Sequence, residues 1–422
     1  MGVEERNVLV KALEAEKPSV RLHAVKELGK LKDQSLVKYF KKIIKHDTHS
    51  HVRREAVSSL GRLRDPKSIS FLCSITNDPD PKVVIQVVRA LLIFKDKSLV
   101  QKKIHELLGH ENEMIQEILL KSLSEAPKKT IDLRVVSPDV LKNVIVSGDA
   151  LQTLQLLPDE SFHLTFTSPP YYNARDYTFY KSYNEYLNFL ITIVRELARV
   201  TKEGRFFIIN TSPIIVPRVS RQHASKRYPI PFDLHSIIVE EGWEYIDDII
   251  WLKPEASVKN RVGGFMQHRK PLGYKPNTVT EMLMVYRKKT PKLLDWNMRA
   301  YPKEIVEASK VMGDYDSSNV WKIDPVYNKN HTAVFPETLC RKIIQYYSYK
   351  GDLIYDPFAG SGTLGDTAQK MGRYFFMTEN NDEYFSYMKQ RFSVQTPSLF
   401  HEETTPSCFS INQFKKYIKE NI

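Results

Sequence analysis

The sequence lacks the residues and runs on which several protein classes depend. It contains only three cysteines, Cys73, Cys340 and Cys408, and their scattered positions leave no pair at metal-ligand spacing and no even-numbered disulfide framework. No apolar run approaches the roughly 18 residues of a transmembrane helix. The start of the chain is charged from Glu4 onward, unlike a secretory signal peptide. We therefore expect a protein of a reducing compartment that has no cysteine-based metal site.

The overall composition is that of an ordinary globular protein with an excess of positive charge. Hydrophobic residues make up 42% of the 422 residues, which is enough for a sizeable core. A chain of this length usually contains two domains or one enlarged domain. The net charge of +12 favours a polyanionic partner, although a basic surface also serves solubility.

The first part of the chain contains an internal repeat. Residues 19–33 recur as residues 51–65, a third copy spans 82–96, and a degraded fourth begins near Met114. A second helical pattern lies between successive copies, so each unit of about 31 residues predicts two helices. This pattern resembles HEAT repeats, in which each unit buries its apolar face only against its neighbours. We expect residues 1–126 to form an all-α solenoid, which is either a stabilising extension or a docking surface for DNA or a partner protein.

The pattern of residues 142–392 predicts an α/β domain, which a proline- and lysine-containing linker at 127–141 separates from the repeats. Apolar strand patterns begin at seven places, near residues 143, 163, 204, 243, 280, 353 and 373. Helical patterns alternate with several of them, as in a Rossmann-like mixed sheet. Residues 393–422 are largely polar, with one short helical pattern, and are expected to form a C-terminal tail.

A rigid turn follows the second of these strand patterns. The apolar run 162–166 leads into Thr167-Ser168-Pro169-Pro170-Tyr171, where two prolines fix φ and remove two backbone donors. The turn therefore offers fixed carbonyl acceptors beside one hydroxyl and one aromatic face. This equipment suits a planar ring with an exocyclic amine, which would stack on Tyr171 and donate to Ser168 and to the Pro169 carbonyl. A strand-end turn with an incidental tyrosine is the alternative.

A glycine-rich turn lies far downstream. Residues 356–363, with the sequence D-P-F-A-G-S-G-T, follow an apolar strand pattern and open a helical one. Such a turn lets the backbone approach a nucleotide cofactor closely, and an acid at the end of the next strand, here Glu379, commonly binds ribose hydroxyls. No G-K-S or G-K-T follows the glycines, so a phosphate-binding loop for ATP is not expected.

The two motifs, in this order and at this separation, resemble those of the amino-group DNA methyltransferases that use S-adenosylmethionine. The resemblance is to the permuted, beta-type subgroup, in which the catalytic motif precedes the cofactor motif, and it covers roughly residues 140 to 392. It implies a catalytic role for Ser168, Pro169, Pro170 and Tyr171. It implies a cofactor-binding role for Asp149, Phe335, Pro336, Asp356, Phe358, Ala359, Gly360, Ser361, Gly362, Thr363 and Glu379. Asp149 is expected to accept from the adenine amine of the cofactor, to cap a helix, or to do both.

Two basic segments broken by glycine and proline, 217–228 and 254–275, interrupt the α/β domain. Loops of this length inside a compact domain are usually functional, and we expect 254–278 to be a target-recognition insertion, with a plain solvated loop as the alternative. The candidate DNA-binding residues are Arg175, Arg218, Arg221, Lys259, Arg261, His268, Arg269 and Lys270.

The resemblance also suggests which base is modified. Family members with serine at the first position of the S-P-P-Y tetrapeptide tend to methylate N4 of cytosine, and those with aspartate usually methylate N6 of adenine. We expect a site-specific methyltransferase acting on N4 of cytosine in flipped-out bases of double-stranded DNA. N6-adenine methylation remains open, as do an RNA or protein amine substrate and an inactive methyltransferase fold on a HEAT protein. None of the cysteines lies in a Pro-Cys turn, which argues against 5-methylcytosine chemistry.

The same resemblance gives the expected setting. No metal is expected, and a cognate restriction endonuclease of a restriction-modification system is a candidate partner. The expected location is the cytoplasm of a prokaryote, in association with the nucleoid.

Overall fold

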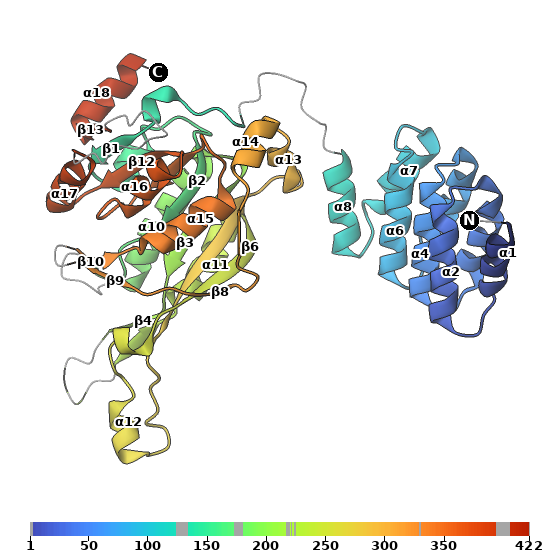
Figure 1. Cartoon of the computed structure of the whole chain (residues 1–422), viewed down its shortest axis with the longest axis horizontal. Helices are drawn as coiled ribbons and strands as arrows, with labels where there is room; N and C mark the ends of the chain where they lie inside the picture. Colours follow the sequence, from blue (N-terminus) through green and yellow to red (C-terminus); the bar gives the residue numbers. More distant parts are fainter. Residues whose placement is uncertain are drawn as a thin grey trace. The chain divides into compact units, whose positions relative to one another are not determined.

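The computed structural model describes residues 3–123, 134–172, 180–216, 220, 222, 225–328, 331–393 and 406–421. The chain divides into two compact units, Met1–Lys128 and Lys129–Ile422 (Figure 1). Residues 127–133 of the predicted linker lie outside the described residues. Three of the predicted DNA-binding residues also lie outside them, namely Arg175, Arg218 and Arg221.

The first unit is all-α. Helices α2, α4 and α6 lie side by side, because the apolar face of each, including Leu28, Leu60 and Leu91, is buried in one core (Figure 1). The helices are α1 (Val3–Ala12), α2 (Pro18–Lys30), α3 (Val37–His46), α4 (Ser50–Arg62), α5 (Ile69–Ser74), α6 (Pro81–Leu92), α7 (Ser98–Leu107) and α8 (Glu113–Leu123), with short 3-10 turns at Gln34–Leu36 and Pro66–Ser68. The predicted repeat is therefore confirmed as a stack of helix pairs.

The same ion pair recurs in successive repeats. Arg21 Nε lies 2.7 Å from Asp47 Oδ2, and Arg53 Nε lies 2.8 Å from Asp78 Oδ2, with each arginine near the start of one helix and each aspartate in the following inter-repeat turn. Asp80 accepts from the Lys82 N–H and caps α6. These contacts fix the turns between neighbouring units.

The second unit contains one large mixed sheet, so the predicted fold class is confirmed. The strand order is β13-β1-β12-β11-β2-β3-β7-β6-β8, and β7 alone runs antiparallel to its neighbours within this sheet. Its strands are β1 (Val144–Ser147), β2 (Phe162–Thr167), β3 (Thr201–Thr211), β6 (Trp243–Leu252), β7 (Thr280–Lys288), β8 (Val320–Lys322), β11 (Leu353–Asp356), β12 (Tyr374–Glu379) and β13 (Ser407–Ser410). All seven predicted strands are present, and the short strands β8 and β13 extend the sheet to nine.

The end of the chain corrects one sequence prediction. Residues 406–421 do not form a separate tail, because β13 pairs in parallel with β1 and α18 (Ile411–Asn421) buries Phe414 and Ile418 against the sheet. A strand of four residues in a polar context gives too weak a pattern to be recognised from sequence. Residues 394–405 lie outside the described part of the chain.

Helices cover both faces of the sheet. Val144 and Val146 of β1 point into one core and Ile145 into the other, as the two-residue period of a strand requires. The helices on the first face are α9 (Ala150–Leu154), α10 (Tyr183–Val200), α11 (Ile230–Glu240) and α18, and those on the second are α15 (Glu337–Tyr347), α16 (Thr363–Lys370) and α17 (Asp382–Ser393). The remaining elements are β4 (Ile214–Val216), β5 (Lys226–Tyr228), β9 (Val326–Asn328), β10 (His331–Val334), α12 (Gly263–His268), α13 (Asp295–Met298), α14 (Lys303–Ala308) and 3-10 turns at Asp139–Leu141 and Glu255–Ser257.

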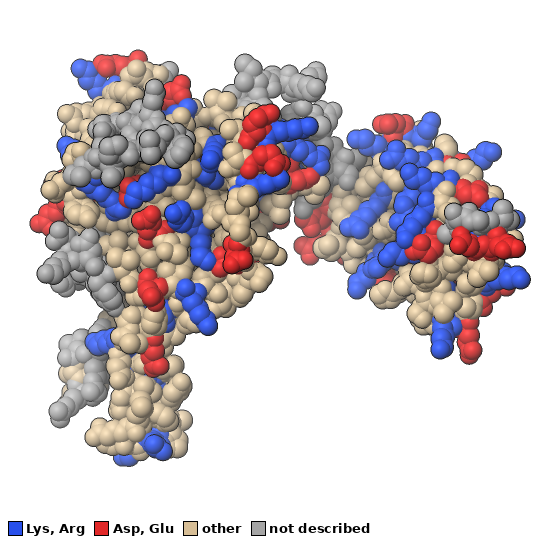
Figure 2. Space-filling model, viewed as in Figure 1, with Lys and Arg blue, Asp and Glu red and all other residues tan. Residues whose placement is uncertain are grey.

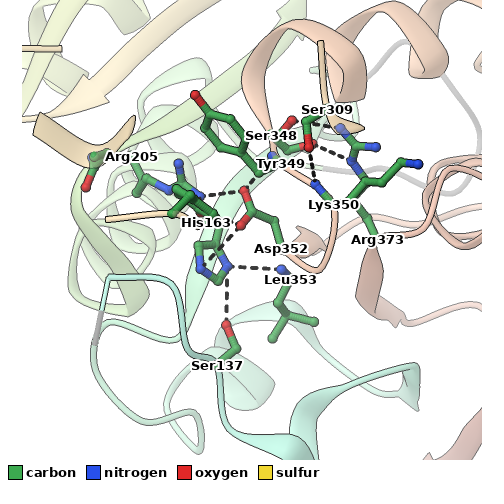
Figure 3. Close-up of polar contacts among 12 residues, drawn as sticks. Ser137, His163, Arg205, Ser309, Ser348, Tyr349, Lys350, Asp352, Leu353 and Arg373 are labelled. Carbon is green, nitrogen blue, oxygen red and sulfur yellow. Dashed lines mark hydrogen bonds and ion pairs between the residues drawn. The ribbon is translucent and has the colours of Figure 1, made fainter. Parts of the chain in front are cut away.

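A buried polar cluster closes the amino-terminal ends of the central strands (Figure 3). Arg205 of β3 lies 2.5 Å from the carboxylate of Asp352, which precedes β11, and it also donates to the Tyr301 hydroxyl. His163 of β2 accepts from the Leu353 N–H at 3.0 Å through Nδ1, and its Nε2 lies 3.6 Å from Asp352 Oδ1. The cluster thus ties three strands and the α13–α14 segment together.

The pKa values in this cluster follow from burial and pairing. Burial lowers the pKa of His163 to about 3, although Asp352 acts in the opposite direction. Burial alone would raise the pKa of Asp352, but Arg205 and the other donors around it hold that pKa below its usual value. The cluster therefore contains a neutral histidine and a compensated ion pair.

Candidate active site

The two sequence motifs meet at the carboxyl ends of the central strands. β2 and β11 are neighbouring parallel strands, so the turns that follow them lie side by side. The Thr167 hydroxyl donates to Asp356 Oδ1 at 2.6 Å and links the two motifs directly, although they are 189 positions apart. Both turns open into a cavity of about 680 Å³.

Most of the predicted site residues line this cavity. They are Asp149, Ser168, Pro169, Pro170, Tyr171, Phe335, Asp356, Phe358, Ala359, Gly360, Ser361, Thr363 and Glu379. Pro336 and Gly362 do not line it: Pro336 is buried at the start of α15, and a Cβ at Gly362 would come within 2.9 Å of Met388. These two residues support the walls of the cavity instead of facing it.

The glycine-rich turn is held by the acid at the end of the next strand. Gly360 has φ +53°, and its N–H donates to Glu379 Oε2 at 2.7 Å, while the Asn381 N–H donates to Oε1 at 2.8 Å. Asp149 follows the adjacent strand β1, and its carboxylate caps α9 through the Gln152 N–H at 2.9 Å. Both predicted carboxylates therefore lie at one edge of the cavity, and Asp149 is a helix cap there.

Two acids that line the cavity, Asp356 and Glu379, have raised pKa values. Burial raises the pKa of Asp356 to about 7, even though the Thr167 hydroxyl and the Phe358 N–H stabilise its ionised form. Burial also raises the pKa of Glu379. Neither acid is paired with a lysine or arginine among the described residues, in contrast to Asp352 at the other end of β11.

Three polar residues that the sequence analysis missed complete the wall beside the S-P-P-Y turn. Asn210 Nδ2 lies 2.5 Å from Glu281 Oε2 and 3.4 Å from Ser168 Oγ. The other oxygen of Glu281 pairs with Lys253. All three residues lie at or near the ends of predicted strands, at the same edge of the sheet as the two motifs. A polar residue at the end of an apolar strand pattern was therefore the one feature of the sequence that could have pointed to them.

Tyr171 is anchored at its hydroxyl end. The hydroxyl donates to Glu281 Oε2 at 3.2 Å, and Asn210 Nδ2 lies 3.4 Å from the same hydroxyl oxygen. Burial and the nearby Glu281 carboxylate raise the pKa of Tyr171 well above its usual value, so the phenol stays protonated. The ring is thus fixed at the cavity wall by contacts at its polar end.

An aromatic residue covers the opposite side of the motif. Phe335 stacks on Phe166 with ring centroids 4.6 Å apart and an interplanar angle of 13°. Because Phe166 belongs to β2 and Phe335 precedes α15, this contact brings the predicted segment around residue 335 over the sheet edge. The side chains of residues 331–333, in the strand just before Phe335, lie outside the described part of the structure.

The predicted recognition insertion, residues 254–278, forms a projecting segment that we call the finger (Figure 1). It leaves the end of β6, carries α12, and returns to the start of β7. Lys259, His268, Arg269 and Lys270 are exposed on it. Arg261 is only half-exposed, because its guanidinium donates to the Thr278 hydroxyl and its backbone N–H donates to Asn277. None of these five residues lines the cavity.

Neither a metal centre nor a membrane span is found in the described part of the chain. No group of three or more His, Cys, Asp or Glu side chains is arranged to hold a metal ion among the described residues. Within the same residues, no helix is both long and apolar enough to cross a membrane.

Comparison with known proteins identifies both units. HEAT repeats match residues 6–93. Type II methyltransferase M.MwoI of Methanothermobacter wolfeii is 32% identical over 242 residues, which cover 55% of this chain but only 31% of that relative. DNA adenine methyltransferase YhdJ of Escherichia coli is 29% identical over 260 residues, covering 59% of this chain and 82% of that protein.

A solved structure and a family assignment complete the comparison. PvuII DNA methyltransferase, described as cytosine-N4-specific, aligns with a TM-score of 0.46 and 20% identity over 68% of this chain and 95% of that structure. The DNA methylase family, which comprises N6 and N4 enzymes, matches residues 162–390 and so includes both motifs of the cavity. The chain therefore belongs to the N6/N4 DNA methylase family.

Proposed function

We propose that this protein transfers a methyl group from S-adenosylmethionine to the exocyclic N4 of cytosine in double-stranded DNA. The observation that carries the proposal is the shared cavity, in which the Ser168–Tyr171 turn faces the glycine-rich turn at Gly360. A turn suited to accepting from an amine and a turn suited to a nucleotide cofactor therefore line the same space, which supports the proposal. A single cavity of this kind supports direct transfer, without a covalent enzyme intermediate.

The chemistry of the cavity fits the proposed cofactor. Its volume of about 680 Å³ lies in the range of small-molecule sites. Asp149 and Glu379 place carboxylate acceptors at one edge, where the hydroxyls and amine of a nucleoside would donate, and Gly360 leaves the backbone accessible. When bound, S-adenosylmethionine supplies an electrophilic methyl group on a sulfonium centre.

The S-P-P-Y turn prepares the target amine. An exocyclic amine is a poor nucleophile because its lone pair is delocalised into the ring. Ser168 Oγ and the Pro169 carbonyl can each accept one amine hydrogen, which favours a pyramidal nitrogen with a localised lone pair. Tyr171 replaces the stacking that the base loses when it leaves the duplex, so positioning supplies much of the rate enhancement.

Glu281 holds the side chains of the S-P-P-Y turn in position. Its carboxylate accepts from Tyr171 and from Asn210, and Asn210 in turn lies within hydrogen-bond reach of Ser168. Lys253 holds the second carboxylate oxygen. The three residues therefore fix the hydroxyl of Ser168 and the ring plane of Tyr171 relative to the cavity, and a carboxylate near the reacting amine also suits the positive charge that develops there.

Two cationic surfaces support DNA as the polymer. The finger carries Arg269 and Lys270 at exposed positions, and Figure 2 shows Lys and Arg at its far end. In the HEAT unit, Figure 2 shows Lys and Arg gathered over α4 and α6, which carry exposed Arg54, Arg62 and Arg89. Such surfaces neutralise phosphates without reading sequence. A role in a restriction-modification system, with a cognate endonuclease, accords with the type II relatives.

N6-adenine methylation is the second candidate. Adenine and cytosine present the same N–C=N edge, so Ser168 and the Pro169 carbonyl could accept from either amine. The relative YhdJ is named as a DNA adenine methyltransferase and supports this candidate. The serine at position 168 favours cytosine, by resemblance to family members with S-P-P-Y.

One experiment tests the reaction and the base together. The purified full chain is incubated with unmethylated duplex DNA and S-adenosylmethionine, and the nucleosides are identified by mass spectrometry after digestion. N4-methylcytosine is the expected product, and Tyr171→Ala should form it about 100-fold more slowly. N6-methyladenine would keep the mechanism and overturn the assignment of cytosine. Cofactor binding without any methylated DNA nucleoside would overturn DNA as the substrate, and no cofactor binding would indicate an inactive fold.

A further inference from the structure

The far end of the finger exposes a cluster of large apolar side chains. Met266 is 64% exposed, Tyr274 is 59% exposed, and Leu272 is 103% exposed, the highest value among the exposed large hydrophobic residues. Soluble proteins scatter single apolar residues over their surfaces, but several on one projecting tip indicate a contact with a partner.

Leu272 also occupies a strained backbone position. Residues 270–273 form a turn in which the Gly273 N–H donates to the Lys270 carbonyl at 3.2 Å, with Pro271 second and Leu272 third. Leu272 has φ +67°, a conformation that the third residue of such a turn normally reaches as glycine. A leucine there costs about 1–2 kcal/mol, and strain of this kind clusters at functional sites. The turn therefore holds an exposed leucine at a position where glycine would make the fold more stable.

The finger below the tip is held by its own contacts. The Asn277 side chain accepts from the Arg261 N–H at 2.5 Å and donates to Glu255 Oε1 at 2.7 Å. Nearer the tip, the rings of Phe265 and Tyr274 meet edge to face with centroids 5.2 Å apart. These contacts join the outgoing and returning arms, so the tip is carried on a braced support.

The finger begins at the rim of the cavity. Ser257 and Val258 line the cavity, and the Lys253 N–H donates to the Val279 carbonyl at 2.7 Å to close the finger's base. Arg269, Lys270 and Lys275 are exposed cations within three positions of Leu272 in the chain. An apolar group flanked by cations matches a duplex, in which apolar base faces lie between two lines of phosphates.

We propose that the tip of the finger is a wedge that inserts Leu272 between base pairs next to the target base. The inference rests on the proposed function, because it assumes that the base must enter the cavity. Apolar side chains that enter a base step unstack it and kink the duplex, and flanking cations bind the phosphates. Leu272 would thus occupy space that opens when the target base rotates out, with Met266 and Tyr274 packed beside it.

The first test measures unwinding and needs no knowledge of the target sequence. Closed circular plasmid is relaxed by a topoisomerase in the presence of the full-length protein and is then deproteinised. Wild-type protein should shift the topoisomer distribution, because an inserted side chain unwinds the helix. Leu272→Gly should reduce the topoisomer shift at least fivefold when the two proteins are compared at equal DNA occupancy. Fluorescence anisotropy measures that occupancy. Glycine suits the positive φ, so this variant should fold at least as well as the wild type.

The matched control is Leu293→Ala, which truncates another exposed leucine outside the finger, 70% exposed. It should unwind DNA like the wild type. An unaltered topoisomer shift with Leu272→Gly, or no shift with the wild type, would overturn the wedge. A tip that instead joins two copies of the chain would show as a dimer in sedimentation that Leu272→Gly converts to monomer, and this would also overturn it.

A second test connects the wedge to the reaction. A duplex containing a site that the wild type modifies, mapped on methylated plasmid, is compared with the same duplex in which the target base is mispaired. Leu272→Gly should lower kcat/KM about tenfold on the paired duplex and recover most of it on the mispaired one. Equal losses on both duplexes would contradict insertion. Unwinding without methyl transfer to any DNA would instead disprove the proposed function and leave the wedge standing.

Discussion

The two ends of strand β11 carry aspartates whose surroundings are opposite. Asp352, before the strand, is paired with Arg205, and its pKa is held below the usual value. Asp356, at the end of the strand, is also buried, but among the described residues it accepts only from the Thr167 hydroxyl and the Phe358 N–H, and its pKa is raised to about 7. One end of the sheet is thus closed by compensated charge, and the other leaves polar groups directed at a cavity. The difference teaches that an uncompensated buried acid marks a ligand site better than burial alone.

The largest expected effect is of pH on the closed end. The folded pKa of His163 is about 3, below its usual value of 6.5, so only the unfolded state takes up this proton as the pH falls. The contribution of neutral His163 to the free energy of unfolding is complete above pH 6.5. It should decline by about 1.4 kcal/mol per pH unit below that value, for a total loss of roughly 5 kcal/mol near pH 3. Urea unfolding between pH 7 and 4.5 measures the slope. His163→Asn should remove this component, and an equal slope in both proteins would contradict it.

Breaking the ion pair should unfold the closed end. Asp352→Asn leaves Arg205 buried without its counter-charge, and we expect a loss of about 3–5 kcal/mol in the free energy of unfolding. Asp356→Asn should change stability by only about 1 kcal/mol, since an amide oxygen can still accept from Thr167. Cofactor affinity should respond in the reverse order. Denaturant titration and calorimetric binding of S-adenosylmethionine compare the two, and similar effects on both quantities would remove the distinction.

A pair of glycines extends the comparison to the backbone. Gly360→Val should weaken cofactor binding at least about 100-fold, or about 3 kcal/mol, because Gly360 has φ +53° and approaches the cavity. Gly351→Val is the matched control at the other end of β11, with φ +83° and open space around it. It should lower stability while the folded protein still binds S-adenosylmethionine. An unchanged dissociation constant for Gly360→Val would refute the close approach.

The stacking role of Tyr171 should appear in catalysis rather than in cofactor binding. Tyr171→Ala should lower methyl transfer to DNA about 100-fold, because the flipped base loses its stacking surface. Affinity for S-adenosylmethionine should stay within about twofold, a change below 0.5 kcal/mol. Tyr171→Phe keeps the ring and removes the hydroxyl with its contacts to Glu281 and Asn210, so it should be much milder. Loss of cofactor affinity in Tyr171→Ala would sink the stacking role.

The smallest expected effect tests the residues behind the motif. Glu281→Gln should reduce kcat about tenfold, roughly 1.4 kcal/mol, while KM for S-adenosylmethionine stays unchanged. The single amide oxygen cannot accept from Lys253 on one side and from Tyr171 and Asn210 on the other, so the anchor of Tyr171 is weakened. Glu244→Gln serves as a control, since Glu244 lies on the neighbouring strand β6 and does not line the cavity. Steady-state kinetics on duplex DNA measure both. A loss confined to thermal stability would make Glu281 a structural residue only.

The recognisable part of the site is the part that is continuous in sequence. T-S-P-P-Y and D-P-F-A-G-S-G-T each form a single turn. Residues that are neighbours in such a turn are also neighbours in the chain, so a sequence motif reveals them together. Asn210 lies in β3, Glu281 lies in β7 and Lys253 directly follows β6, and each is one polar residue next to an apolar run. The pairing register of β3, β6 and β7 is what brings these three side chains together at one wall of the cavity. Arg261 shows the reverse case, since its charge suggested DNA while its contacts brace the finger.

The amino-acid sequence by itself determined the helical repeats, the seven main strands and the two motif turns, because these depend on periodicity and on proline and glycine geometry within a few residues. Only the tertiary structure decided that β13 adds to the edge of the sheet, that Asp352 and Asp356 have opposite pKa shifts, and that Leu272 stands at the tip of a braced finger. These properties depend on which groups meet across long separations in the chain. Pairing and desolvation are set by such contacts and leave no local pattern in the sequence.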